Sequence, residues 1–215
     1  PADDRFEAMQ SMADMVDFSA ALRTLALTLI RIANDLRLLA SGPSTGLDEI
    51  LLPAVQPGSS IMPGKVNPSI AEMVNQVCFQ ALGLDTTVAL AAEAGQLELN
   101  VMMPVITHNM VFGLIIVGNA SRVFAEKCID GIEADEKQCL YWLERSPALV
   151  TALAPKIGYA ESAKLSKEAI ATGLTVKELV VKKKLLEGEE LEHTLDLRAM
   201  TELGVPGGHG LPGGG

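Results

Sequence analysis

Apolar positions in the first forty residues recur at helical spacing. Between residues 4 and 39 they alternate at intervals of three and four, which predicts one very long helix ended by Ser41-Gly42-Pro43. The seam consists of Met15, Phe18, Leu22, Leu25, Leu29, Ile32, Leu36 and Leu39. A second apolar set, Leu27, Ile30 and Leu38, lies off this seam. A helix with apolar residues on several sides is buried on several sides, so we expect a bundle larger than this chain can build alone.

The next segments alternate between a loop and further helices. Residues 44–57 lack strong periodicity, and glycines and prolines then punctuate residues 57–68, which forbids a helix and predicts a shaped loop. We expect helices over residues 69–82, with Gly83 as the stop, over residues 85–94, and over residues 101–129. The last of these is apolar all round between residues 111 and 117, which predicts deep burial. Within it, His108 is interpreted as a hydrogen-bonded core or interface histidine.

The pattern changes after Gly131. Residues 134–201 form short helical stretches, separated by Pro147, Pro155, Gly158, Gly173 and Gly188. The run at residues 182–184, three lysines, is interpreted as a solvated face. The predicted class is all-α, with part of a long-helix bundle domain over residues 1–131 and a small C-terminal helical domain over 132–203. The Gly- and Pro-rich residues 204–215 are predicted to be a disordered tail.

Composition narrows the functional classes. Of 215 residues, 48% are hydrophobic but only 4% aromatic, a composition typical of helix-on-helix packing. A formal net charge of −10 makes nucleic acid an unfavourable partner. Three scattered cysteines show neither metal spacing nor a disulfide framework, which suits a cytoplasmic location, and Cys78 and Cys128 are expected in the core. No run of about 18 uncharged apolar residues is present, so no membrane span is expected. The first residue, Pro1, suggests a piece of a longer protein.

The loop at residues 57–68 concentrates polar chemistry. Lys65 is its only formal charge, and it also carries Ser59, Ser60 and Asn67. Asn67-Pro68 is expected to open the next helix as N-cap and first helical residue, with Ser69 and Glu72 forming a capping box. A cation, two hydroxyls, an amide and a helix N-terminus together predict a site for a small anion such as a carboxylate. The alternative is a surface loop that happens to be rich in small residues.

The string Gly-Ser-Ser-Ile-Met-Pro-Gly-Lys-Val-Asn-Pro over residues 58–68 resembles the signature loop of the aspartase/fumarase superfamily. The resemblance extends over residues 6–201. Residues 32–39, 41–43 and 46–47 resemble the family's long helix and following turn, and 132–201 resemble its C-terminal domain. The string at residues 93–102 resembles aspartases in particular. Two positions depart from the family pattern: Ser44 replaces the usual Arg, and Met103 replaces the Glu of aspartases or the Lys of fumarases.

The resemblance implies a homotetramer whose central helices form one bundle and whose active sites gather residues from several subunits. It implies a lyase that eliminates ammonia reversibly from L-aspartate, a small dicarboxylate, to give fumarate without a cofactor or metal. By match to the family motif, Ser59 is the general base, Lys65 and Asn67 hold substrate carboxylate, and Ser60 shapes the loop or donates to the substrate. Glu72 matches a glutamate that pairs with a histidine of the preceding, missing half. The loop itself is mobile in the family. Alternatives are a fumarate hydratase and a non-catalytic structural subunit like the lens proteins related to argininosuccinate lyase.

Overall fold

The computed structural model describes residues 2–203, and the chain divides into two compact units, the first ending at Asp135 and the second beginning at Glu136. The first contains α1 (Arg5–Gln10), α2 (Ala13–Leu39), β1 (Ile50–Leu51), α3 (Ser69–Glu93), α4 (Met103–Lys127), a 3₁₀ turn at Ile129–Gly131 and β2 (Glu133–Ala134). Helices dominate both units, which confirms the all-α class. The tail predicted at 204–215 lies outside the described residues.

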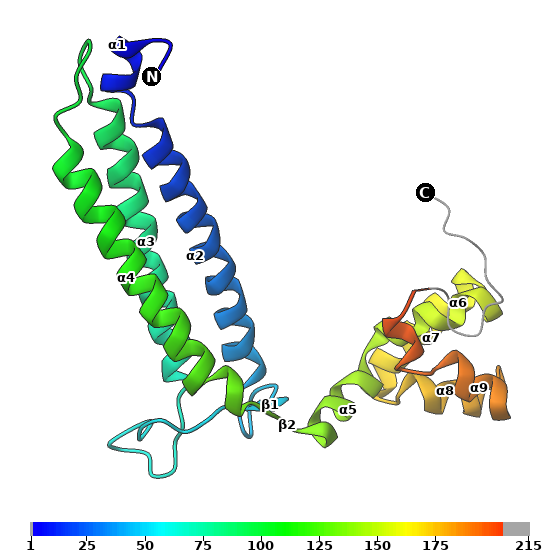
Figure 1. Cartoon of the computed structure of the whole chain (residues 1–215). Coiled ribbons are helices and arrows are strands. Elements are labelled where there is room, and N and C mark those ends of the chain that lie inside the picture. Colours follow the sequence, from blue (N-terminus) through cyan, green and yellow to red (C-terminus); the bar gives the residue numbers. More distant parts are fainter. Residues whose placement is uncertain (1, 204–215) are drawn as a thin grey trace. The chain divides into compact units, whose positions relative to one another are not determined.

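Helix α3 lies between α2 and α4, and the three long helices run side by side (Figure 1). Small residues line the contact between α2 and α3, because Ala26, Ala33 and Ala71 are all completely buried. Small side chains let helix axes approach closely, which suits this packing. Cys78 and Cys128 lie in the same core, as predicted, and burial raises the pKa of both thiols.

Buried polar pairs set the register of these helices. The Ser19 hydroxyl donates to Oδ1 of Asp85 at 2.6 Å, and Arg23 binds the other oxygen of that carboxylate at 3.0 Å. Further along, Nδ2 of Asn75 donates to Oδ1 of Asn34 at 2.8 Å. A buried polar group is costly unless it is paired, so sliding α2 along α3 would break these bonds.

A short clasp fixes the chain just before the loop at residues 57–68. Strands β1 and β2 pair antiparallel, with Ile50 opposite Ala134 and Leu51 opposite Glu133. Gly131 lies so close to Pro53 that a Cβ there would meet Pro53 Cγ at 2.6 Å. The clasp therefore ties the start of the loop to the segment that follows α4 (Figure 1).

Two helix predictions were wrong. The single helix expected over residues 4–39 is interrupted: Asp4 caps α1, and Ser11 is extended, with φ −67° and ψ 131°, before α2 begins. Gly83 does not end a helix, because α3 runs unbroken from Ser69 to Glu93. Leu84 and Asp85 are buried next to Gly83. Packing against α2 and α4 at this point outweighs the helix penalty of about 1 kcal/mol for one glycine.

Helix α4 buries one face in this unit, through Ile106, Val117 and Phe124. In this single chain the middle of α4 is not deeply buried, since Leu114 and Ile115 are 44% and 54% exposed, and its burial in a larger bundle stays a prediction. His108, expected to be a core or interface histidine, is not in the core: it is exposed in this chain, and its ring stacks on Phe112 at 6.0 Å between centroids, while an interface position stays a prediction. Among residues 2–203, one helical stretch, Met103–Gly131, is long and apolar enough to cross a membrane by length and composition alone, which the sequence pattern did not predict. This stretch includes Thr107, His108 and Asn109, so its apolar character is interrupted.

Within the described part of the second unit, residues 136–203, five short helices pack around a core of their own. They are α5 (Glu136–Arg145), α6 (Val150–Ile157), α7 (Tyr159–Thr172), α8 (Val176–Lys182) and α9 (Gly188–Thr194), with 3₁₀ turns at Pro147–Leu149 and Ala199–Thr201. Leu153 and Leu179 are fully buried at its centre. Gly158 and Gly173 separate helices at positive φ, as their positions predicted, whereas Pro155 lies inside α6. The three lysines at 182–184 are exposed, and Lys183 pairs with Glu168.

Candidate functional site

The glycine-rich loop emerges beyond the N-terminal end of α3 (Figure 1). At its neck, the backbone N–H of Gly58 donates to the Lys65 carbonyl at 2.8 Å. A Cβ on Gly58 would lie 2.3 Å from that carbonyl oxygen, so only glycine lets the two sides approach this closely. Gly64 turns the chain back at φ +79°. The loop is thus closed on itself by its own backbone.

Ser59 is half-buried inside this loop and accepts two backbone hydrogen bonds. The N–H groups of Ile61 and Met62 point at its Oγ from 3.1 and 3.2 Å. Donors aimed at one oxygen stabilise negative charge that develops on it, and in this half-buried position they take the place of hydrogen bonds from water. The neighbouring Ser60 is exposed. The structure therefore distinguishes the two loop serines, which the sequence pattern alone does not.

The other predicted residues of the loop occupy different positions. Lys65 is exposed. Asn67 is half-buried, and its Nδ2 donates to the Gly58 carbonyl at 2.6 Å, which adds a second bond across the neck. Asn67 is therefore not the N-cap: Pro68 occupies that position and α3 begins at Ser69. The amide closes the loop instead of capping the helix.

The predicted capping box of Ser69 and Glu72 is also wrong. Ser69 is the first helical residue and not the cap, so its hydroxyl is placed differently and accepts a bond from Nε2 of Gln56 at 3.0 Å. Glu72 lies in the first turn of α3, half-buried. A carboxylate in the first turn of a helix is stabilised by the helix dipole.

A shallow hollow of about 380 Å³ lies against the loop. Its lining is Ala54, Val55, Gln56, Pro57, Gly58, Ser59, Gly64, Lys65 and Val66. The structure thus brings Ser59 and Lys65 to one hollow, while Ser60, Asn67 and Glu72 do not line it. Gln56 does line it and was missed by sequence reasoning, because nothing in its local pattern marks a glutamine before a proline.

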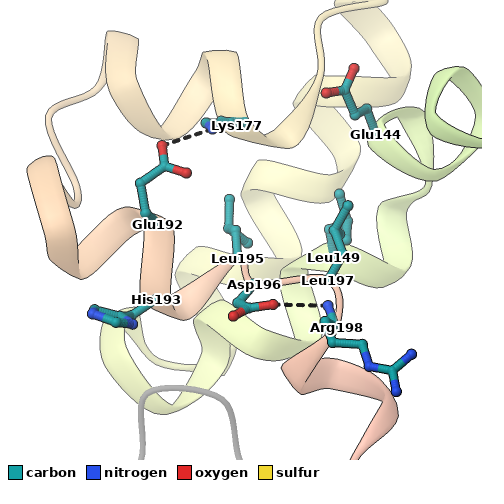
Figure 2. A pocket seen from close by; sticks show the side chains of 9 residues that line it. All are labelled: Glu144, Leu149, Lys177, Glu192, His193, Leu195, Asp196, Leu197 and Arg198. Atoms are coloured by element: carbon teal, nitrogen blue, oxygen red, sulfur yellow. Dashed lines mark hydrogen bonds and ion pairs between the residues drawn. The ribbon is translucent and has the colours of Figure 1, made fainter. Parts of the chain in front are cut away.

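A larger hollow of about 500 Å³ lies in the second unit, with Leu149, Leu195 and Leu197 in its lining (Figure 2). Among its charged groups, Lys177 pairs with Glu192 at 2.8 Å, and the Asp196 carboxylate accepts the backbone N–H of Arg198 at 2.9 Å. These groups do not converge on one point. Within residues 2–203, no cluster of three or more His, Cys, Asp or Glu side chains could hold a metal ion.

Fold and site define a long-helix bundle that presents a serine- and lysine-bearing loop at the end of its central helix. Residues 1–83 match a family model described as "Lyase", and residues 149–202 match one described as "Fumarase C C-terminus". The aspartate ammonia-lyase of Bacillus subtilis is 47% identical over 206 residues, which cover 96% of this chain and 43% of that protein. The class II fumarate hydratase of Corynebacterium glutamicum is 46% identical over 204 residues, which cover 93% of this chain and 43% of that protein.

Solved structures show similarity to the same kinds of protein. A protein from Brucella melitensis described as "fumarate lyase:delta crystallin", bound to cobalt, superposes with a TM-score of 0.85 at 50% identity, over 91% of this chain and 42% of that chain. A class II fumarase from Schistosoma mansoni superposes with a TM-score of 0.84 at 38% identity, over 92% of this chain and 42% of that chain. The chain belongs to the aspartase/fumarase superfamily of lyases. It spans 43% of the length of the Bacillus subtilis and Corynebacterium glutamicum relatives.

Proposed function

We propose that this chain is the C-terminal part of a lyase that eliminates ammonia reversibly from L-aspartate to give fumarate. The observation that carries the proposal is the pair of backbone N–H donors on Ser59 Oγ, in the same hollow as Lys65. Similarity to aspartate ammonia-lyases of Bacillus subtilis and Helicobacter pylori, at 47% and 49% identity, supports this substrate.

The chemistry requires a base at the carbon that loses its proton. A C–H bond next to a carboxylate is a weak acid, so the base must be strong and the resulting charge must be held. In the proposed step, ionised Ser59 Oγ takes the proton from the β-carbon, and the C–H electron pair moves into the adjacent carboxylate. The pair then forms the C=C bond of fumarate as the C–N bond breaks and ammonia leaves. The N–H groups of Ile61 and Met62 lower the cost of ionising Ser59 before this step.

The remaining residues receive binding roles in this proposal. Lys65 supplies the positive charge that holds a substrate carboxylate, and Ser60, exposed beside Ser59, donates to substrate or shapes the loop. Asn67 can bind a carboxylate only after its amide leaves the Gly58 carbonyl, because Nδ2 is bonded to that oxygen. Substrate binding by Asn67 and closure of the loop neck are therefore coupled. Glu72 is proposed to pair with a histidine from the preceding half of the protein.

We also propose that the complete protein is a cytoplasmic homotetramer that works without a cofactor. The apolar residues Leu25 of α2 and Ile115 of α4 are exposed in the single chain, and symmetry mates would cover them. Assembly of sites from several subunits would supply the groups that this chain lacks.

A second candidate is fumarate hydratase activity, favoured by the 46% identity to the Corynebacterium glutamicum enzyme. A third, a non-catalytic structural subunit, is less compatible with an intact Ser59, Lys65 and Asn67. The full-length protein should be supplied with L-aspartate and, separately, with malate, and fumarate followed by its ultraviolet absorbance. We expect fumarate from aspartate alone. Fumarate from malate would identify a hydratase, and fumarate from neither substrate would favour a structural subunit.

A further inference from the structure

We infer that Gln56 is a positioning residue that latches the loop at residues 57–68 to the first turn of α3. The inference rests on the proposed function in one respect only, namely that the loop it positions carries the general base. Its partner is Ser69, whose Oγ accepts a hydrogen bond from Gln56 Nε2 at 3.0 Å.

The latch is the outermost of three bonds across the neck of the loop. The Gly58 N–H donates to the Lys65 carbonyl at 2.8 Å, and Nδ2 of Asn67 donates to the Gly58 carbonyl at 2.6 Å. These two bonds join loop residues to loop residues. The bond from Gln56 to Ser69 is different, because Ser69 belongs to α3.

Each end of the loop is thus held by a different rigid element. The clasp of β1 and β2 holds the chain up to Leu51, and α3 holds it from Ser69 onward. Between Leu51 and the neck, Leu52 packs against the core of the helical unit, and the latch adds a side-chain hydrogen bond from the incoming chain to α3. Gln56 also lines the hollow that contains Ser59 and Lys65, so a shift at Gln56 moves the wall of the proposed site.

The latch makes two predictions with different readouts. Removing it should let the neck open more often, and Lys65, exposed at the loop, is a trypsin site that reports such opening. It should also lower kcat with little change in KM for aspartate, because loop placement matters most when the proton is transferred. One lost hydrogen bond of ordinary strength corresponds to roughly a fivefold change in each quantity.

The experiment compares Q56A, S69A and the double variant with the full-length wild-type enzyme. The matched control is S69T, which keeps the hydroxyl that accepts the bond. Cleavage at Lys65 is timed by mass spectrometry against cleavage in the second unit, and thermal unfolding checks that the variants fold. We expect both single variants to be cut roughly fivefold faster and to turn over roughly fivefold more slowly, with the double variant no worse than either and S69T like wild type.

The outcomes separate the latch from the proposed function. Unchanged cleavage at Lys65 in Q56A, or effects of Q56A and S69A that multiply in the double variant, would overturn the latch even in an enzyme that produces fumarate. Faster cleavage together with a wild-type enzyme that makes no fumarate would instead uphold the latch and overturn the proposed function. G58A provides an independent check: its Cβ would clash with the Lys65 carbonyl, so it should speed cleavage at Lys65 even with the latch intact.

Discussion

Replacing Ser59 with alanine in the full-length enzyme should lower kcat by at least ~10³-fold, about 4 kcal/mol of barrier, with little change in fold. The substitution removes the oxygen that we propose takes the proton. It also removes the acceptor of two backbone hydrogen bonds, from Ile61 and Met62. Both effects lower the rate, so the size of the decrease must decide between them.

The loss of loop order has a limited size. A typical hydrogen bond contributes about 1 kcal/mol, so two lost bonds account for at most about 2 kcal/mol, or roughly 30-fold in rate. This is an upper estimate, because Ser59 is only half-buried and water can replace it on the two N–H groups. A decrease of ~10³-fold or more therefore exceeds what disorder of the turn explains, and identifies Ser59 as a group that reacts.

The matched control is S60A, because Ser60 is the adjacent loop serine, is exposed, and lies outside the hollow. The assay follows fumarate from saturating aspartate, and succinate binding by calorimetry shows that the site of each variant is still formed. S60A should retain at least about a tenth of wild-type kcat, within the range that a lost peripheral hydrogen bond permits. If S59A itself retained a tenth of wild-type kcat, Ser59 could not be the base.

Four further outcomes are expected. K65A should weaken succinate binding by about 1.5–3 kcal/mol in calorimetry, since it removes the loop's only cation, and unchanged affinity would exclude Lys65 from the site. N100A should destabilise the protein by about 2–3 kcal/mol in denaturant unfolding, because fully buried Asn100 binds the carbonyls ending α3 and a backbone N–H before α4, whereas exposed N119A should be nearly neutral. Hydrogen bonds from Thr175 lower the pKa of Glu178 from 4.5, so its stabilisation of the second unit is present above that value and is lost as pH falls through the lowered pKa; E178Q should flatten this acid dependence in thermal melts. The chain expressed alone should associate and make no fumarate, and a monodisperse 22.8 kDa species in light scattering would contradict this.

Much of the fold could be predicted from local pattern. Periodicity, turn residues and composition predict the long helices, the glycine-rich loop and the shorter helices after Gly131. They also predict the burial of Cys78 and Cys128. The errors occurred where a distant contact outweighed a local signal or where no local signal was present. Gly83 by itself predicts a helix end. Helix α3 nevertheless continues through it, because buried residues on both sides of Gly83 pack against other helices. The helix break at Ser11 has no glycine or proline beside it that would predict a break.

The sequence by itself determined that this chain is helical and which residues carry charge and hydroxyls in the loop. It also determined the family, because the string at residues 58–68 is long and specific. Only the tertiary structure decided what each polar group contacts: Ser59 accepts two N–H bonds while Ser60 is exposed, Asn67 closes the neck instead of capping α3, and Gln56 reaches Ser69. The physical reason is that residue type fixes hydrogen-bonding capacity, whereas the partner depends on which backbone groups the packed helices and the closed loop bring within about 3 Å.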